Sequence, residues 1–393
     1  MILEQNQVGK SKKALYIIAL NFLATNAILQ IYQSLVPLIM QRDFKVSEWK
    51  IGIVTGVVNV VVCVLLLALN KVRRTIGMLV IGGTILSVAL ALTPLSIKLG
   101  NVVLFVALVY VGMMSISYIK VIANDFILCV ASPGKENGAM ALTKIMSAIG
   151  GIIVFLIMYI LNDNCMFWSM VLLNVLTVGG IYCIRGQVCR SKYESDSEVD
   201  QKNNSGLGKR SVKALIVILL CYTVYNASVS TFSRYSTIVW NMEDNDFAIY
   251  QSICLVTAFI AYFPIGKISN KDNQKRITII GMVLLIASMI SMAALSEFHF
   301  VAIISIGLVG VAWATISVNL VPILVCGANE QEVSSLVGFY SIICNVALIV
   351  APVISGFILE YLPYRMLYPL LSAILVVAIF ILLMTKNEKS KCE

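Results

Sequence analysis

Long apolar stretches follow one another along the whole chain and are separated by short polar segments. A helix needs roughly 20 apolar residues to cross the hydrocarbon layer of a bilayer. Twelve stretches reach that length with few charged residues, so we predict twelve transmembrane helices. Their approximate limits are 14–38, 51–70, 76–97, 101–130, 138–161, 166–184, 213–238, 246–266, 277–295, 300–326, 333–357 and 366–385.

The amino-acid composition agrees with this pattern. Hydrophobic residues make up 59% of the chain, charged residues make up 12%, and the mean hydropathy is +0.92. Soluble globular domains carry about twice that share of charged residues. We therefore expect an all-α polytopic membrane protein. Residues 1–13 lack the apolar core of a secretory signal, so we expect the amino terminus to stay attached.

Lysine and arginine residues set the expected orientation, because cytoplasmic segments near a membrane carry an excess of them. With the amino terminus inside, most of these residues fall on the cytoplasmic side, and those on the outer side are Arg42, Lys45, Lys50, Lys98 and Arg365. We therefore predict a multi-pass protein of the plasma membrane with both termini in the cytoplasm. The net charge of +9 follows from this bias and gives no support for nucleic-acid binding.

A polar segment, residues 185–212, divides the predicted helices into two sets of six. It mixes charges and has too few apolar residues to pack, so we predict a cytoplasmic linker. The flanking domains are then an N-terminal six-helix bundle, residues 1–184, and a C-terminal one, residues 213–393. The second half weakly repeats the first, since the motif that begins at Gly112 returns at Gly310. This repetition predicts that the two bundles are pseudo-symmetric.

Several segments resemble those of a known family. The loop GKISNKDNQKR, which begins at Gly266, resembles a loop of the major facilitator superfamily, with Asn270 in place of its Asp and Lys271 in place of its Arg. The segments YNASVSTFSRY from Tyr225 and GVAWA from Gly310 resemble the sucrose/proton symporter-like and glycoside/cation symporter branch. This resemblance implies transport by alternating access, with Gly266, Asn270 and Lys271 in a gating loop.

Polar side chains inside the spans are costly in lipid and normally face a bundle interior or water. Among Asn, Gln, Asp, Lys and Arg residues, only Asn174 falls in the third, sixth, ninth or twelfth span. In the superfamily that the chain resembles, every third helix is an outer support and the others line the path. We therefore predict a substrate site on the other helices. Its candidate residues are Asn26, Gln30, Gln33, Ser117, Lys120, Asn124, Tyr222, Asn226, Arg234, Trp313 and Asn319.

Charged residues inside the spans are the most informative, since a charge at mid-bilayer costs about 2.5–3.5 kcal/mol on insertion scales. Lys120 lies deep in its span, where it contacts substrate or snorkels toward the headgroups. Asp125, the one carboxylate away from the first residue of a predicted span, and Lys144 are predicted to pair and to act in gating or coupling. Arg234 guards an outer entrance or snorkels. For each uncharged polar residue, a hydrogen bond that joins helices is the alternative interpretation.

These features predict a secondary active or facilitative transporter of a small polar solute, sugar-like or anionic, that acts as a monomer with or without a coupling ion. Two alternatives remain open: an efflux transporter of amphipathic compounds, and a non-transporting receptor or scaffold of transporter ancestry. An enzyme is disfavoured, because the sequence has no HExxH pair and no clustered carboxylates in its spans. We expect no cofactor and no metal site, since His299 is the only histidine.

The ten cysteines make the predicted topology testable. Only Cys165 falls in a predicted outer loop, whereas Cys189 and Cys392 fall in cytoplasmic segments. A membrane-impermeant maleimide added to intact cells should therefore label Cys165 alone, as read by peptide mass spectrometry. Strong labelling of Cys189 or Cys392 from outside would show that the orientation is wrong.

Overall fold

The structure, a computed structural model, describes residues 2–69, 75–130, 136–161, 163–184, 209–243, 246–270, 272–297, 300–326 and 330–385. Within these ranges it contains helices and turns and no strand. Eleven of the described helices are long and apolar enough to cross a membrane. The twelfth is α2, of which residues 48–64 are described in full. The prediction of an all-α fold is confirmed.

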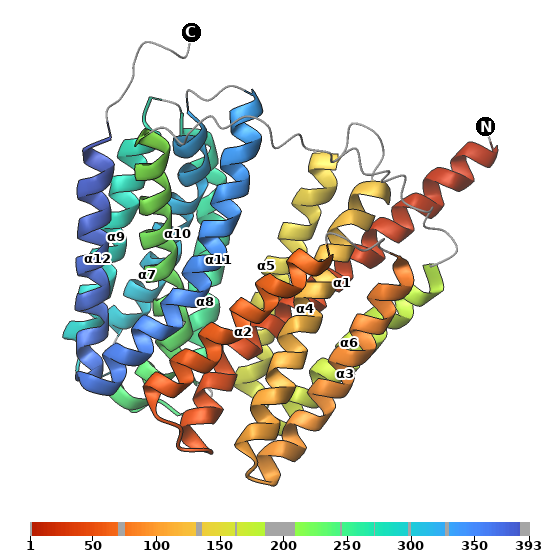
Figure 1. The fold of residues 1–393 in the computed structure, drawn as a ribbon, viewed down its shortest axis with the longest axis horizontal. Coiled ribbons are helices and arrows are strands. Elements are labelled where there is room, and N and C mark those ends of the chain that lie inside the picture. The colour runs from red at the N-terminus through yellow and green to blue at the C-terminus, as the bar shows by residue number, and fades with distance from the viewer. Residues whose placement is uncertain are drawn as a thin grey trace. The chain divides into compact units, whose positions relative to one another are not determined.

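The helices follow the predicted order (Figure 1). The first six are α1 (Ile2–Arg42), α2 (Glu48–Leu69), α3 (Ile76–Lys98), α4 (Val102–Val130), α5 (Glu136–Ile160) and α6 (Asp163–Ile184). The other six are α7 (Lys209–Val239), α8 (Asp246–Ile268), α9 (Gln274–Ala294), α10 (Phe300–Val325), α11 (Glu330–Tyr361) and α12 (Leu367–Leu383), with a 3-10 turn η1 (Tyr364–Met366) before α12. Each predicted span falls on one helix, because length and hydropathy alone define it.

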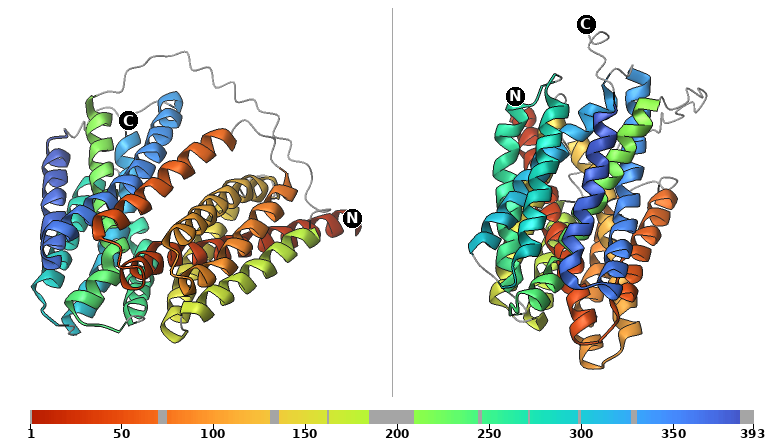
Figure 2. Two further views of the ribbon diagram at one scale, coloured as in Figure 1. Left: turned by 60° about the horizontal axis from the view of Figure 1, so that its bottom comes forward. Right: turned by 90° about the vertical axis from the view of Figure 1, so that its left-hand side faces the viewer.

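The chain forms two compact units with the same pattern of helix contacts. In the N-terminal unit, α1 lies against α4, α5 and α6, and α3 lies against α4 and α6. In the C-terminal unit, α7 lies against α10, α11 and α12, and α9 lies against α10 and α12 (Figure 2). Each of the N-terminal pairs just named recurs in the C-terminal unit with both helix numbers raised by six. The structure therefore shows the pseudo-symmetry that the sequence repeat predicted.

Helix α2 is divided between the two units. Residues 46–59 pack with the C-terminal unit, while the chain before them and the chain from residue 60 onward belong to the N-terminal unit. The sequence had placed this whole stretch in the N-terminal bundle. The helix also begins at Glu48, three residues before the predicted span, so a carboxylate becomes part of its first turn. The predicted linker, apart from its last four residues, lies outside the described residues.

Small residues and amides hold the N-terminal unit together. A Cβ at Gly150 on α5 would overlap the carbonyl oxygen of Leu23 on α1, so these two helices touch through their backbones. Asn174 on α6 donates to the carbonyl oxygen of Gly83 at 2.7 Å and to the hydroxyl of Ser87 at 2.8 Å, both on α3. The amide of Asn174 therefore joins α6 to α3. This contact explains why an asparagine occurs in a span that was predicted to be an outer support.

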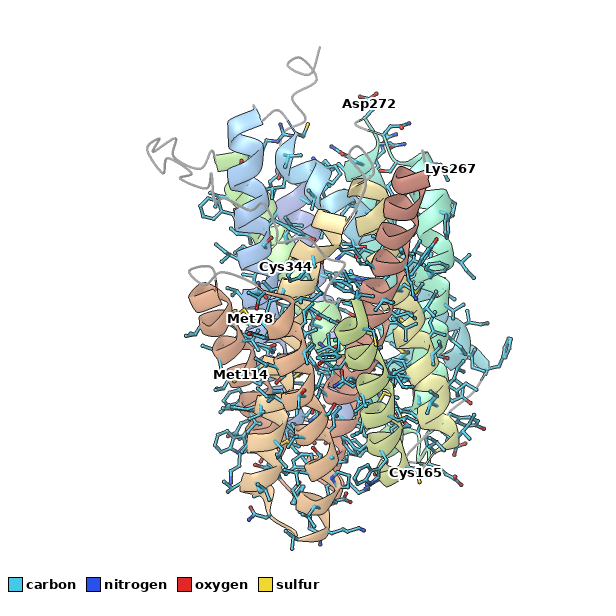
Figure 3. The ribbon with its side chains drawn as sticks, turned by 90° about the vertical axis from the view of Figure 1, so that its right-hand side faces the viewer. Met78, Met114, Cys165, Lys267, Asp272 and Cys344 are labelled. Atoms are coloured by element: carbon cyan, nitrogen blue, oxygen red, sulfur yellow. The ribbon has the colours of Figure 1, made fainter. Side chains whose placement is uncertain are left out.

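Figure 3 shows Cys165 and Met78 toward opposite ends of the N-terminal unit. Cys165 is exposed at the start of α6, and Met78 is in the first turn of α3. Because these two helices are in contact, their opposed starting points show that they run antiparallel. Cys165 is accessible in the way that the predicted labelling requires.

The α1–α5 contact predicts a stability difference between two glycine variants of the N-terminal unit. Gly150→Ala should destabilise the protein by about 1–3 kcal/mol through overpacking, because the new methyl group meets backbone that cannot move aside. Gly179→Ala on α6 is the matched control, since nothing lies within 4 Å of a Cβ there. Thermal unfolding in detergent should show a lower midpoint for the first variant alone. Equal midpoints would contradict the close contact.

Candidate functional site

A lysine and an asparagine meet inside the N-terminal unit. The ammonium of Lys120 on α4 donates to the side-chain oxygen of Asn26 on α1 at 3.2 Å. The amide nitrogen of Asn26 donates in turn to the backbone oxygen of Ser147 on α5 at 2.7 Å. Because both ends of this amide are engaged, its oxygen is held facing the ammonium. Three helices thus position one positive charge.

Other predicted residues of the N-terminal unit lie near this group. Ser117 and Asn124 are half-buried on the Lys120 face of α4, and Gln30 and Gln33 are half-buried on the Asn26 face of α1. Lys144 on α5 is exposed. The side chain of Asp125 lies outside the described residues, so the predicted Asp125–Lys144 pair is not tested.

Lys120 is an unusual residue for a span because of what surrounds it. It belongs to the described span Val102–Asn124, where an ionised side chain is expensive. Among the described side chains, the ammonium of Lys120 donates a hydrogen bond to the amide oxygen of Asn26. It forms no ion pair with any of them. A single neutral acceptor leaves two of its three N–H donors for other groups. This arrangement favours a ligand that accepts hydrogen bonds or carries negative charge.

Aromatic side chains form a cluster in the C-terminal unit. Trp313 on α10 stacks on Tyr225 of α7, with ring centroids 3.8 Å apart and an angle of 5° between the ring planes. Tyr222 of α7 meets the same indole edge-on at 4.9 Å. The hydroxyl groups of Tyr222 and Tyr340 of α11 are hydrogen-bonded at 2.5 Å. Packed rings thus place phenolic hydroxyls at fixed positions on one unit.

Further polar groups border this aromatic cluster. The hydroxyl groups of Tyr262 on α8 and Ser317 on α10 are 3.2 Å apart. Asn226 on α7 is half-buried, and its amide nitrogen donates to the backbone oxygen of Tyr222 at 2.7 Å. The amide oxygen can accept a hydrogen bond from a donor group of a solute. The cluster therefore combines flat apolar faces with hydroxyl and amide groups, which suits a solute with both kinds of surface.

Sequence reasoning found only part of this cluster. It identified Tyr222, Asn226 and Trp313 but did not assign Tyr262 or Tyr340 to the site, because the search counted amide and charged residues inside the spans. Tyrosine is amphipathic and is tolerated in lipid, so its presence in a span is a weak signal. Helical spacing did indicate part of the cluster, since Trp313 and Ser317 are four residues apart and so lie on the same face of α10.

Arg234 is paired inside the C-terminal unit. Its guanidinium forms an ion pair with Glu48 in the first turn of α2, and the two residues are 2% and 6% exposed. The hydroxyl of Tyr364 in η1 donates to the other oxygen of the same carboxylate at 2.5 Å. Arg234 therefore does not snorkel, and its charge is already met by protein. We do not retain it as a substrate contact.

Asn319 is likewise engaged with protein. It is fully buried on α10, accepts a hydrogen bond from the hydroxyl of Ser269, and donates to the backbone oxygen of Thr315 at 2.8 Å. Ser269 follows α8 directly, at the start of the predicted gating loop. The structure therefore places Asn319 beneath this loop, where it fixes the loop rather than faces a solute.

The predicted gating loop has an ordered beginning. The backbone N–H of Asn270 donates to the side-chain oxygen of Asn273 at 2.6 Å, and the Asn270 carbonyl accepts from the backbone of residues 273 and 274. Gly266 lies in the last turn of α8 with open space around it. Lys271 lies outside the described residues. In Figure 3 the labelled residues Lys267 and Asp272 flank this loop at one end of the C-terminal unit.

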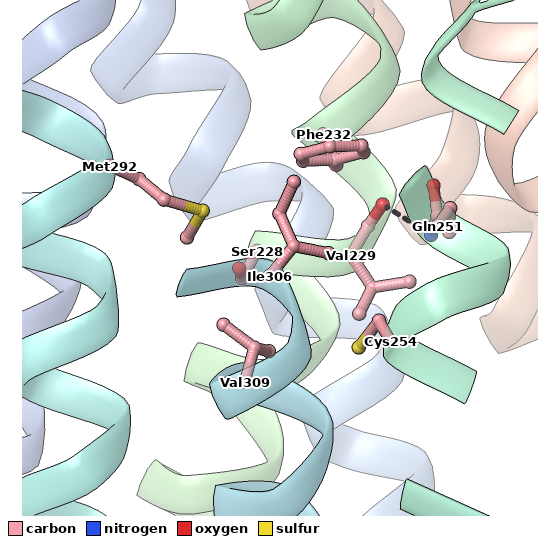
Figure 4. Close-up of a pocket in the computed structure, with 8 residues that line it drawn as sticks. All are labelled: Ser228, Val229, Phe232, Gln251, Cys254, Met292, Ile306 and Val309. Atoms are coloured by element: carbon pink, nitrogen blue, oxygen red, sulfur yellow. Dashed lines mark hydrogen bonds between the residues drawn. The ribbon is translucent and has the colours of Figure 1, made fainter. Parts of the chain in front are cut away.

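A small pocket also lies between α7, α8, α9 and α10 (Figure 4). Its lining is mostly apolar and consists of Ser228, Val229, Phe232, Gln251, Cys254, Met292, Ile306 and Val309. The amide nitrogen of Gln251 donates to the backbone oxygen of Val229 at 3.3 Å across one side of it. None of the predicted site residues lines this pocket, so we give it no role in the site.

Comparison with known sequences supports the predicted superfamily in part. The model described as Major Facilitator Superfamily matches residues 214–391, which cover the C-terminal unit from α7 to the end of α12. No curated protein sequence is similar enough to count as a relative. The narrower resemblance to sugar symporters stays a prediction.

Solved structures share the fold over nearly the whole chain. The nucleoside transporter NupG superposes with a TM-score of 0.76 at 14% identity, covering 96% of this chain and 100% of that chain. The POT family transporter PepTSo gives 0.75 at 12% identity, with 95% and 97% covered. A bacterial homologue of the iron transporter ferroportin gives 0.72 at 11% identity, with 94% and 98% covered. The protein is therefore a multi-pass membrane protein with the major facilitator fold.

The hydroxyl pair of the aromatic cluster predicts energetic coupling between α7 and α11. Tyr222→Phe and Tyr340→Phe should each destabilise the protein, and the double variant should lose less than the sum, by about 0.5–1.5 kcal/mol. Thermal unfolding of the four proteins measures this coupling. Tyr361→Phe is the control, since that side chain is 72% exposed. Strictly additive losses would show that the hydroxyl groups do not interact.

Proposed function

We propose that the protein is a secondary transporter that moves a small polar solute across the membrane by alternating access. The observation that carries this proposal is the Lys120–Asn26 group, a fixed positive charge inside a span whose only described hydrogen-bond partner is a neutral amide. A purely structural helix bundle gains nothing from such a charge, whereas a solute site does. The major facilitator fold of the chain agrees with this proposal.

Each unit, considered by itself, has side chains that suit a class of solute. Lys120 favours acceptors such as hydroxyl, phosphate or carboxylate groups, while the rings of Trp313 and Tyr225 favour a flat or ring-shaped apolar face. Hydroxyl groups of Tyr222 and Tyr262 add donors and acceptors at the edge of those rings. Lys120 in the N-terminal unit is consistent with a sugar-like or anionic solute, and the rings of the C-terminal unit are consistent with a solute that has an apolar face. Similar structures are titled as transporters of nucleosides and peptides, so the fold alone does not select the solute.

The remaining features of the proposal follow from the sequence. The excess of lysine and arginine in alternate loops supports cytoplasmic termini and a place in the plasma membrane. Asp125 and Lys144 remain the candidates for coupling to an ion, with Gly266, Asn270 and Lys271 in the gating loop. We propose that the protein works as a monomer, because each six-helix unit supplies its own set of polar residues.

Flux in proteoliposomes tests the proposal directly. Purified protein is first screened by thermal shift against hexoses, disaccharides, nucleosides and small carboxylates, and the stabilising solutes are then used in radiolabelled form. Time-dependent accumulation above that of empty liposomes is the expected result. Binding without flux would favour the receptor alternative, and flux of amphipathic compounds alone would favour the efflux alternative.

Lys120→Met separates a solute contact from a tolerated charge. The variant keeps the length and apolar stem of lysine and removes its charge. We expect normal folding, with solute binding and flux reduced at least about tenfold, which corresponds to roughly 1.4 kcal/mol. Lys98→Met, at the exposed end of α3, is the matched control and should behave as the wild type. Wild-type flux in Lys120→Met would remove Lys120 from the site.

A further inference from the structure

Helices of the C-terminal unit bring positively charged side chains together where α12 ends. The ammonium of Lys275 on α9 donates to the backbone oxygens of Thr385 at 2.7 Å and Leu383 at 3.3 Å. The ammonium of Lys213 on α7 donates to the backbone oxygen of Met384 at 3.4 Å. Helix α12 lies against both α7 and α9 (Figure 1). Two ammonium groups from different helices are therefore held on three consecutive carbonyl groups.

Two arginines enlarge this group of charges. Arg210 is half-buried one turn before Lys213 on α7, and Arg276 is exposed directly after Lys275 on α9. No ion pair within the described part of the chain involves any of these four residues. We call Arg210, Lys213, Lys275 and Arg276 the cationic cluster.

The protein compensates only part of the charge of the cationic cluster. Carbonyl groups at the end of a helix together supply about half a negative elementary charge. Asp272, the described carboxylate nearest to α9 in the preceding loop, is exposed and forms no ion pair with the cluster. Capping of α12 therefore explains why two lysines lie there, but it leaves most of four positive charges for another partner.

Apolar side chains continue from the cationic cluster along the surface of the same helices. On α9, Arg276 shares a face with Ile280 and Val283, which are both exposed. On α7, Lys213 shares a face with exposed Ile216. The exposed apolar residues at the end of α12 are Phe380, Leu383 and Met384. Each helix thus presents an apolar surface next to the charges.

This arrangement matches the two parts of an anionic phospholipid. A phosphate group accepts several charge-assisted hydrogen bonds and supplies the negative charge that the cationic cluster lacks. Acyl chains match the exposed apolar side chains, for which a free phosphate ion has no use. Helix α7 follows the predicted cytoplasmic linker, and basic pockets between helices on that side of a membrane bind anionic headgroups.

We propose that the cationic cluster is a binding site for an anionic phospholipid, whose phosphate contacts the cluster and whose acyl chains lie along α9 and α12. Because Lys213 and Lys275 also hold the end of α12, the bound lipid links the ends of three helices. The inference is independent of the proposed function, since it requires neither a solute nor transport.

Native mass spectrometry of the purified protein in detergent tests the site. The protein is titrated with dioleoylphosphatidylglycerol, which is anionic, or with dioleoylphosphatidylcholine, which has the same chains and no net charge. The dissociation constant of the first bound lipid is read from the peak of the one-lipid complex. We expect phosphatidylglycerol to bind at least about tenfold more tightly, since anionic lipid is attracted by each basic residue near the surface. Equal affinities would overturn the proposal.

Arginine variants locate the preference. Arg210→Gln with Arg276→Gln should abolish it, whereas Arg210→Lys with Arg276→Lys should retain it, because the charge is kept. The matched control is Lys13→Gln with Lys267→Gln, which removes two exposed cations of α1 and α8 on the same predicted side of the membrane. It should bind as the parent does. The proposal is overturned if the glutamine pair at the cluster keeps the preference, or if the control loses as much.

Thermal unfolding without added lipid separates lost binding from lost folding. The glutamine pair should unfold at the parent midpoint, because neither arginine has an ion-pair partner among the described residues. If the pair does not fold, Arg276→Gln alone changes one exposed side chain and should still weaken phosphatidylglycerol binding about threefold. Parent-like binding by a folded Arg276→Gln protein would then overturn the assignment.

Two further measurements distinguish a lipid from a free anion. Inorganic phosphate in tenfold excess should leave phosphatidylglycerol bound, because it cannot replace the contacts of the acyl chains. Displacement of the lipid by phosphate would identify an anion site and overturn the lipid assignment. Phosphatidylglycerol with a photoactivatable diazirine near the start of one acyl chain should label peptides of α9 or α12. Labelling confined to other helices would show that the lipid binds elsewhere.

Discussion

The hydrocarbon layer of a bilayer contains almost no water, so each polar group placed there needs a partner within the protein. This constraint accounts for the most specific contacts of the structure. The carbonyl oxygen of Leu348, left without its helical donor by Pro352, accepts from Asn59 of another helix. The side-chain amide of Asn174 donates hydrogen bonds to two groups of α3. Both hydrogen bonds join helices that are distant in the sequence.

Two cations of the spans, Arg234 and Lys120, meet the constraint in different ways. Arg234 forms an ion pair with the Glu48 carboxylate, which also accepts a hydrogen bond from Tyr364. The cost of burying its charge is therefore compensated within the C-terminal unit. Lys120 has an amide oxygen, which compensates only part of the cost of the charge. A site that is stable yet incompletely compensated is suited to bind a solute reversibly. On the function that we propose, Arg234 holds helices together and Lys120 binds the solute.

The sequence predicted the number, order and approximate limits of the helices, because these depend only on the length of apolar runs. It did not predict the partner of Arg234. Glu48 lies just before the apolar run of α2, and only the structure shows that the helix begins there and that Glu48 is buried 186 residues away from its partner. Asn319 and Asn26 look alike in the sequence, yet one is bound to Ser269 beneath a loop and the other faces a lysine. Long-range geometry of this kind leaves no periodic signal along the chain.

The close contact of α2 with α11 has a consequence for the thermodynamics of the protein. Docking of ordinary helices freezes side-chain rotamers, and each long side chain that is fixed costs up to about 1.5–2 kcal/mol in entropy. Gly52, Gly56 and Gly356 have no rotamers to lose, so contact between α2 and α11 orders little beyond the backbone of two helices that are already rigid. The difference in side-chain entropy between packed and separated α2 and α11 is therefore small. Warming the membrane shifts the equilibrium between these two arrangements less than it would shift one between leucine-lined helices.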